Sequence, residues 1–169
     1  MGLIGKLFRI SHFLWQKKIV LIPDLLCFLI RIIYGADIHY QAQIGKGVVF
    51  SHNGLGTIIH PRAIIGDNVV VGAHVVIGCN LDAFDVPKIG NNVFIGPGAK
   101  ILGDIEIGSH ILIGANSVVL SSIPDGCVVV GAPAKIVRNL SRDEILAYWP
   151  HTNIIVDLLQ NFFFWMLVF

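Results

Sequence analysis

A six-residue period runs through the middle of the chain. Nearly every sixth residue from Ile59 to Val119 is apolar and branched, and a glycine follows most of them. The full row is Ile59, Ile65, Val71, Ile77, Ala83, Ile89, Ile95, Ile101, Ile107, Ile113 and Val119, with Ala83 as the exception. A period of six fits neither an α-helix nor the alternation of an ordinary strand. It predicts a parallel β-helix, in which three hexapeptides make one triangular coil and stacked coils bury an apolar column.

The composition limits the size and the partners of the protein. Its 169 residues suffice for one domain with terminal extensions, and a net charge of +1 gives no electrostatic basis for binding nucleic acid. Hydrophobic residues make up 54% and charged residues only 14%, against about 25% in a typical protein. This apolar excess has two interpretations, which are burial between the subunits of a homotrimer and contact with a membrane surface.

The cysteines and the first residues bear on the compartment. Cys27, Cys79 and Cys127 are odd in number and match no metal-binding spacing. The N-terminal segment lacks the order of features that marks a secretory signal. We therefore predict a cytoplasmic protein without a metal site, with peripheral contact at the inner face of a membrane as a further expectation.

The chain divides into three regions, at residues 1–35, 36–138 and 139–169. Residues 3–18 combine apolar residues at helical spacing with interleaved basic residues, which predicts a basic amphipathic helix. Residues 19–34 predict a second, apolar helix, whose uninterrupted run falls far short of the ~20 residues that span a bilayer. We expect a helical hairpin that lies on the prism, on a neighbouring subunit or on a membrane face.

Two breaks interrupt the repeat, and chemistry is expected where the period fails. Nine residues instead of six separate Phe50 from Ile59, so residues 51–56 form an insertion. Residues 81–87 contain a poor hexapeptide and a proline, which predicts a loop.

The last region predicts an end to the prism. A strand is expected over Cys127–Val130, and Ser141 with Glu144 has the spacing of a capping box that begins a helix. Residues 154–169 are almost wholly apolar, so we expect this tail to be buried in an oligomer or to lie in a lipid interface.

Three motifs in residues 36–138 carry a family resemblance. Asp37-Ile38-His39 is followed by Ser51-His52, residues 95–103 read IGPGAKILG, and residues 131–137 read GAPAKIV. Together they resemble the hexapeptide-repeat acyltransferases, above all the serine acetyltransferase branch and the related polysaccharide O-acetyltransferases. The resemblance implies a left-handed β-helix, a homotrimer, and acetyl-CoA as co-substrate in the groove between adjacent prisms.

His52 and Asp37 are the candidate catalytic residues. Transfer of an acetyl group to a hydroxyl needs a base that works near neutral pH, and histidine is suited to this task. His52 lies in the insertion at residues 51–56, and Asp37, just under one coil earlier, is expected to orient the imidazole and stabilise its charged form. The alternatives are a solvated turn histidine and an aspartate that opens a turn.

The remaining site predictions concern the two substrates. For acetyl-CoA, the resemblance points to backbone contacts in the last coils and to basic partners for its phosphates, at Gly98, Ala99, Gly114, Ala115, Lys135 and Arg138. Candidate contacts of the acceptor are Ser51, Asn53, Asp82 and Asp85.

The other histidines are expected to be structural. His39 and His60 each follow a column residue, where turns prefer polar groups. His74 and His110 share a phase with Asn92 between them, which predicts an outward polar ladder whose histidines are two coils apart, too far to share a zinc ion. Cys79 is interpreted as a small residue of the repeat, with an acyl-cysteine intermediate as the alternative.

Departures from the serine acetyltransferase pattern decide the predicted acceptor. Ser51 replaces an aspartate of that branch, and Asp85-Val86 replaces an Arg-His pair, so the site would repel a carboxylate. A short hairpin also replaces a longer helical domain. We therefore predict an acetyl-CoA-dependent O-acetyltransferase acting on a sugar of a surface-polysaccharide precursor. The alternatives are serine O-acetylation, a non-enzymatic hexapeptide scaffold, and a metal enzyme like the hexapeptide carbonic anhydrases.

Overall fold

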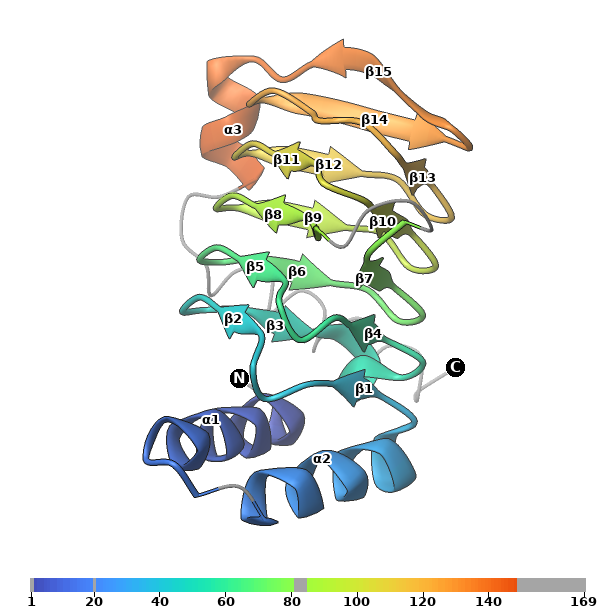
Figure 1. Ribbon diagram of the computed structural model, residues 1–169. Helices are drawn as coiled ribbons and strands as arrows, with labels where there is room; N and C mark the ends of the chain where they lie inside the picture. Colours follow the sequence, from blue (N-terminus) through green and yellow to red (C-terminus); the bar gives the residue numbers. More distant parts are fainter. Residues whose placement is uncertain (1, 20, 81–84, 149–169) are drawn as a thin grey trace, which may run out of the picture.

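The computed structural model describes residues 2–19, 21–80 and 85–148. Stacked coils of short strands form a three-sided prism that stands on a helical hairpin, while a strand pair and a short helix close the opposite end (Figure 1). The predicted left-handed parallel β-helix, with an N-terminal helical hairpin and a C-terminal helix, is confirmed.

Each coil contributes a strand to one of three sheets, which we name A, B and C. Sheet A contains β1 (Asp37–Ile38), β4 (Ile58–Ile59), β7 (Val76–Gly78), β10 (Lys100–Leu102) and β13 (Val118–Val119). Sheet B contains β2 (Gln43–Ile44), β5 (Ile64–Ile65), β8 (Lys88–Ile89) and β11 (Glu106–Ile107). Sheet C contains β3 (Val49–Phe50), β6 (Val70–Val71), β9 (Val93–Ile95), β12 (Ile111–Ile113), β14 (Cys127–Gly131) and β15 (Ala134–Asn139). All neighbours run parallel except β14 and β15, which are antiparallel.

The predicted apolar column is the core of the prism. Ile59 of β4 pairs in register with Ile77 of β7, which pairs with Ile101 of β10, and all three are buried. Because successive side chains of a strand point to opposite faces, the preceding residue of each strand, such as Ile58, faces outward. Burying one isoleucine side chain stabilises the fold by about 1.5–3 kcal/mol, and stacking repeats this gain in every coil.

The loop between β7 and β8 removes one hexapeptide from the prism. Ile89 pairs with Ile107, 18 residues later, whereas Ile77 pairs with Ile101, 24 residues later. The extra six residues include Ala83, the exception in the row; residues 81–84 themselves lie outside the described part of the chain. The loop lengthens this coil by six residues, which is one full period. The six-residue row in the sequence therefore continues without a break, although these six residues form no strand of the prism.

Residues in the left-handed region of backbone space turn the chain at two corners of the prism. At the corner between sheets B and C, φ lies between 55° and 70° at Gly47, Asn68, Asn92, His110 and Gly126. At the corner between sheets C and A, which we name the C–A corner, φ lies between 55° and 75° at Gly56, His74, Gly98 and Asn116. Glycine, asparagine and histidine tolerate this conformation better than branched residues do.

The predicted ladder of polar residues is right for two of its three members. Asn68 Nδ2 donates to Asn92 Oδ1 at 3.2 Å, and Asn92 Nδ2 lies 3.0 Å from His110 Nε2. The placement of His74 in this ladder is wrong. One hexapeptide between His74 and Asn92 belongs to the loop and not to a coil, so His74 lies at the C–A corner, while Asn92 lies at the corner between sheets B and C. There its N–H donates to the carbonyl of Leu55, one row below.

Both ends of the prism are closed by other elements. Helices α1 (Leu3–Gln16) and α2 (Leu21–Tyr34) cover the first coil, where Ile4, Phe8 and Ile30 join the core. At the far end, β15 and α3 (Arg142–Tyr148) follow the last coil. The predicted capping box is present, since the Glu144 N–H donates to Ser141 Oγ and the Ser141 N–H donates to the Glu144 carboxylate. The predicted apolar tail, residues 154–169, lies outside the described residues.

Candidate active site

The insertion at residues 51–56 forms a tight turn on the C–A corner. Residues Ser51–Gly54 make one short helical turn, in which His52 and Asn53 have φ of 52° and 54°. The imidazole of His52 is exposed. Gly54 is buried under α1, and a β-carbon there would lie 3.1 Å from Ile4 Cδ1. Close packing on the hairpin therefore favours glycine and fixes where the histidine emerges.

Asp37 lies at the same corner of the prism as this turn. The Gly56 N–H donates to the carbonyl of Gly35 at 3.0 Å, and the Asp37 N–H donates to the carbonyl of Thr57 at 2.8 Å. These two bonds tie the end of the insertion to the start of β1, one row below. The backbone of Asp37 thus lies next to the end of the insertion, while the contact of its carboxylate with the imidazole of His52 stays a prediction.

The carboxylate of Asp37 has a partner that sequence reasoning missed. Arg31 Nη2 of α2 donates to Asp37 Oδ2 at 2.6 Å, with 63% and 43% of the two side chains exposed. The hydrogen bond to Asp37 and its charge raise the pKa of Arg31 above its ordinary value. In the sequence, Arg31 appears only as a charged residue that interrupts an apolar helix. Its contact with Asp37 depends on how that helix packs on the prism, which the sequence does not show.

Four candidate acetyl-CoA residues lie on the C–A corner above His52. Gly98 turns the corner with φ of 75°, Ala99 is buried beside it, and Gly114 and Ala115 occupy the next row. With strands about 4.8 Å apart, the rows from Gly56 to Asn116 extend about 14 Å along the prism. An extended ligand bound to this corner would run from the His52 turn toward the far end.

Lysine 100 adds a positive charge to these rows. Its Nζ donates to the carbonyl of Gly98 at 2.7 Å and to that of His74 at 3.1 Å. The sequence motif included Lys100, but nothing in its spacing indicated that its ammonium group would fold back onto two turns of the corner.

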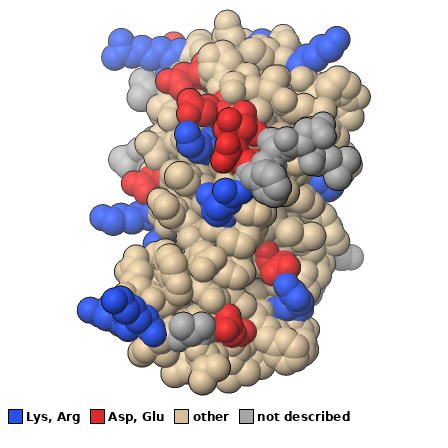
Figure 2. Space-filling view, in the orientation of Figure 1, with Lys and Arg blue, Asp and Glu red and all other residues tan. Residues whose placement is uncertain are grey.

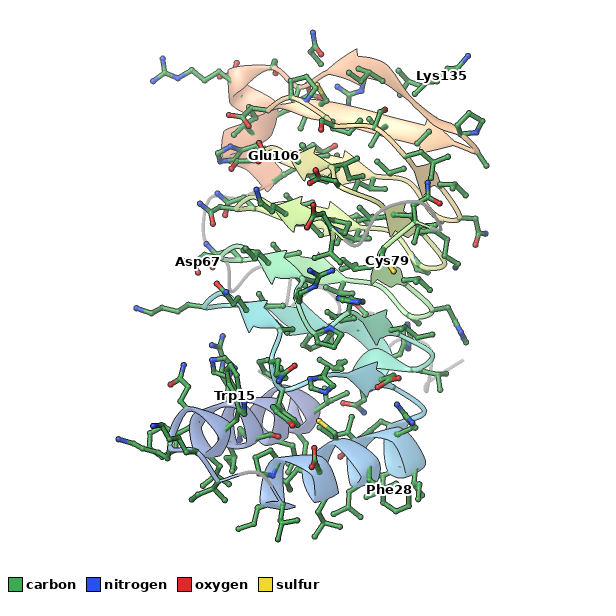
Figure 3. The ribbon with its side chains drawn as sticks, viewed as in Figure 1. Trp15, Phe28, Asp67, Cys79, Glu106 and Lys135 are labelled. Atoms are coloured by element: carbon green, nitrogen blue, oxygen red, sulfur yellow. The ribbon has the colours of Figure 1, made fainter. Side chains whose placement is uncertain are left out.

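The two basic candidates lie at the far end, on β15. Lys135 is exposed and points away from the prism (Figure 3). Arg138 is instead engaged, because its guanidinium lies 2.7 Å from a Glu144 oxygen. The Ser141 backbone N–H and Arg138 together lower the pKa of Glu144. Lys135 is therefore the more available partner for a phosphate.

The acceptor candidates are divided between two corners. Ser51 and Asn53 flank His52 in the turn, whereas Asp85 lies at the corner between sheets A and B, in a groove with Arg62 and Asp104. Within one chain the structure does not bring Asp85 to His52. Asp82 lies outside the described residues.

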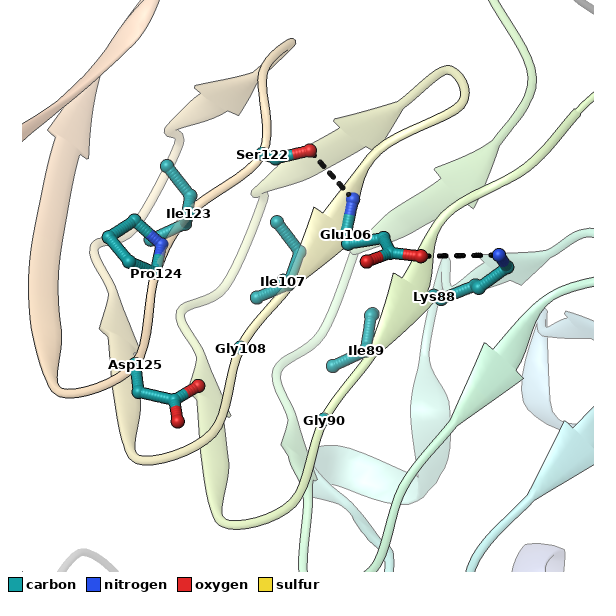
Figure 4. Close-up of a pocket in the computed structure, with 10 residues that line it drawn as sticks. All are labelled: Lys88, Ile89, Gly90, Glu106, Ile107, Gly108, Ser122, Ile123, Pro124 and Asp125. Atoms are coloured by element: carbon teal, nitrogen blue, oxygen red, sulfur yellow. Dashed lines mark hydrogen bonds and ion pairs between the residues drawn. The ribbon is translucent and has the colours of Figure 1, made fainter.

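The outer faces of the three sheets differ in polarity. Sheet B presents charged and polar residues and carries a groove of about 600 Å³, crossed by the ion pair between Lys88 and Glu106 at 3.2 Å (Figure 4). Sheets A and C, which meet at the His52 corner, present mainly apolar residues that are partly or fully exposed, beside Asp37 and Lys100 of sheet A; the apolar residues are Ile58, Val76, Val118, Phe94, Leu112 and Val128. The apolar faces, rather than the sheet B groove, flank the candidate site. Within residues 2–19, 21–80 and 85–148, no cluster of three or more metal-ligating side chains occurs.

Comparison with known proteins identifies the family. Residues 87–121 match the model of the bacterial transferase hexapeptide (six repeats). A serine acetyltransferase of Helicobacter pylori is 39% identical over 132 residues, which cover 77% of both proteins. The chain belongs to the hexapeptide-repeat acyltransferases, in their serine acetyltransferase-like branch.

Two further relatives of this branch extend the comparison. The serine acetyltransferase of Synechococcus elongatus is 40% identical over 131 residues, covering 76% of this chain and 53% of the relative. The crystal structure of serine acetyltransferase in complex with coenzyme A from Brucella abortus superposes with a TM-score of 0.77 and 33% identity, over 80% of this chain and 55% of that one. The chain thus spans about half the length of these two relatives.

Proposed function

We propose that the chain is an acetyl-CoA-dependent serine O-acetyltransferase with His52 as its general base. The observation that supports this most is that one corner gathers the His52 turn, Asp37 and the rows of Gly98 and Gly114. The names of the related proteins favour serine, the alternative acceptor of the sequence analysis, over the sugar that we predicted there. The sugar prediction relied on Asp85 repelling a carboxylate, and Asp85 lies at a different corner from His52 in the single chain.

The reaction follows from this arrangement. The imidazole of His52 takes the proton of the acceptor hydroxyl, and the oxygen attacks the thioester carbonyl carbon. When the tetrahedral intermediate collapses, the C–S bond breaks and the leaving thiolate receives the proton from the imidazolium. The Asp37 carboxylate stabilises the charged ring, while Arg31 holds its Oδ2 atom in place. The N–H groups of Gly56, His74, Gly98 and Asn116 already donate to carbonyl groups of the row below, so the oxyanion would be bound by another backbone N–H of the glycine-containing loops.

A homotrimer would complete the site. The outer faces of sheets A and C carry apolar side chains that are exposed at Ile58 and half-buried at Phe94 and Leu112, and both faces border the C–A corner. Apolar surface of this kind favours contact with another subunit. Packing these faces between three prisms would place a neighbouring wall opposite His52. That wall would supply the second side of an acetyl-CoA groove.

Acceptor choice is tested by thiol release from acetyl-CoA with the purified full chain. L-Serine, a nucleotide sugar and N-acetylglucosamine are offered separately, with an acceptor-free reaction as the blank. We expect turnover with serine at least tenfold above the sugars. Turnover with a sugar but not with serine would restore the sugar acceptor, and an absence of both turnover and CoA binding would favour a scaffold role.

A further inference from the structure

The helical hairpin has a second apolar face, which points away from the prism. On α2 the outward residues recur at helical spacing, and Leu21, Ile32 and Ile33 are 84%, 64% and 62% exposed. The complete set of exposed large apolar residues on α2 is Leu21, Ile22, Leu25, Phe28, Leu29, Ile32 and Ile33. In Figure 3, Phe28 lies at the outer end of the molecule, on the side of α2 opposite the coils.

The adjoining helix widens this apolar surface. Leu3, Ile10 and Phe13 of α1 are more than half exposed, while Ile4 and Phe8 of the same helix are buried against the first coil. The hairpin is thus apolar both toward the prism and away from it. A helix that is apolar on both sides needs a second apolar environment, and a contiguous exposed patch of this kind marks an interaction site.

Positive charge is concentrated in the same segment. Residues 1–35 contain five of the 12 basic residues of the chain and one of its 11 acidic residues, so they carry +4 while the remainder carries −3. Arg9 binds the carbonyl of Ile44, and Arg31 binds Asp37. The exposed lysines of the hairpin are Lys6, Lys17 and Lys18. Figure 2 shows basic atoms gathered at one side of the hairpin end, next to a largely uncharged surface.

We propose that this hairpin docks in the plane of an anionic lipid surface. An apolar helical face bordered by lysines is the combination that binds such interfaces. Each helix has 14 residues, which extend about 21 Å, less than the ~30 Å of a bilayer core. In the part of the chain that the structure describes, no helix is long and apolar enough to cross a membrane. The hairpin therefore lies on the surface.

The same charge argues against a second copy of the chain as the occupant. A two-fold interface brings the same patch of both subunits together, so two hairpins of +4 would face each other. A lipid surface bearing phosphate groups has the opposite sign, and its acyl region accepts Phe28 and its apolar neighbours. If the proposed homotrimer is correct, cyclic symmetry places three hairpins at one end of the assembly, and their affinities combine.

The test is co-sedimentation of the full chain with vesicles. Vesicles of phosphatidylcholine with phosphatidylglycerol are compared with vesicles of phosphatidylcholine alone. We expect binding to the anionic vesicles that weakens as salt is raised. Replacing both Lys17→Ser and Lys18→Ser should reduce the affinity by about fivefold for each lysine, whereas Lys46→Ser with Lys88→Ser on the prism should reduce it far less.

A second pair of variants tests the apolar face. Phe28→Glu with Ile32→Glu should lower vesicle binding at least tenfold, whereas the matched pair Leu120→Glu with Val137→Glu should not. Circular dichroism verifies that all variants fold, and activity is not the readout, so failure here is separable from failure of the proposed reaction. The proposal is overturned if the wild-type chain ignores anionic vesicles, or if Phe28→Glu with Ile32→Glu binds them normally. It is also overturned if that pair lowers the mass of the lipid-free particle, because the face would then join protein subunits.

Discussion

Histidines at different positions of the prism serve different purposes, depending on what the ring contacts. The Gln41 N–H donates to His39 Nδ1, and the Arg62 N–H donates to His60 Nδ1, each at 3.2 Å. Burial lowers the pKa of both rings from the ordinary value of 6.5. A ring that accepts a backbone N–H must leave that nitrogen unprotonated, so these two histidines hold turns as neutral groups.

These turns should make the fold sensitive to acid. Because the folded pKa of His39 and His60 lies below the unfolded one, the unfolded state binds more protons as the pH falls below about 6.5. The free energy of unfolding should therefore decrease in that range. In urea titrations from neutral to acid pH, His39→Asn with His60→Asn should flatten the decrease, since asparagine can accept the same N–H without titrating. A decrease as steep as in the wild type would contradict this role.

The carboxylate of Asp37 should matter for turnover more than for stability. Its ion pair with Arg31 is exposed, and such pairs contribute about 0–1 kcal/mol to stability. Asp37→Asn should lower kcat at least tenfold while changing the free energy of unfolding by less than about 1 kcal/mol. Arg31→Gln is the matched control, because it breaks the same pair but keeps the carboxylate, so it should retain more activity. Equal loss in both variants would show that the ion pair, rather than the carboxylate, is what turnover needs.

Strands and corners of this fold were not equally predictable from the sequence. The six-residue row predicted the inward residues, because burial acts on each coil in the same way. It did not predict which corner a residue occupies, since the loop between β7 and β8 adds one whole period and leaves no trace in the phase. His74 was misplaced for this reason, whereas the insertion at residues 51–56 was recognised because nine residues do break the row.

The glycines of the prism differ in how closely the next row packs against them. A β-carbon at Gly56, where φ is +66°, would lie 2.1 Å from His74 Nδ1, whereas one at Gly78 would have no atom within 4 Å. Gly56→Ala should destabilise the fold by about 2 kcal/mol or more through strain and displacement of His74. Gly78→Ala should change the free energy of unfolding by less than about 1 kcal/mol. Chemical denaturation measures both, and similar values for the two variants would contradict the proposed packing.

At the scale of the whole molecule, the homotrimer of 18.5 kDa chains that the family resemblance implies would bury the outer faces of sheets A and C. Replacing Phe94→Glu with Leu112→Glu on sheet C should dissociate it and abolish turnover, because each site would lose its second wall. Gln43→Glu on the polar sheet B is the control and should leave the assembly intact. Sedimentation equilibrium gives the mass, and an active wild-type monomer would contradict this assembly.

The sequence predicted the site residues that sequence position and motif indicate, but not the contacts that depend on how elements pack. His52 and Asp37 could be chosen from the insertion and from their spacing, and the structure brings their segments to one corner. Arg31 could not be chosen, since its contact depends on how α2 docks. The predicted sugar acceptor gives way to serine in the proposed function, because the names of the relatives favour serine and because Asp85 was judged by its position in a motif and not by the corner on which it lies.

The most direct test of the account is the kinetics of His52→Asn with acetyl-CoA and L-serine. If the imidazole of His52 removes the hydroxyl proton, kcat should fall by about 100-fold or more. The affinity for CoA, measured by calorimetry, and the midpoint of unfolding should stay close to those of the wild type. Turnover within a few fold of the wild-type rate would contradict the assignment of His52 as the base.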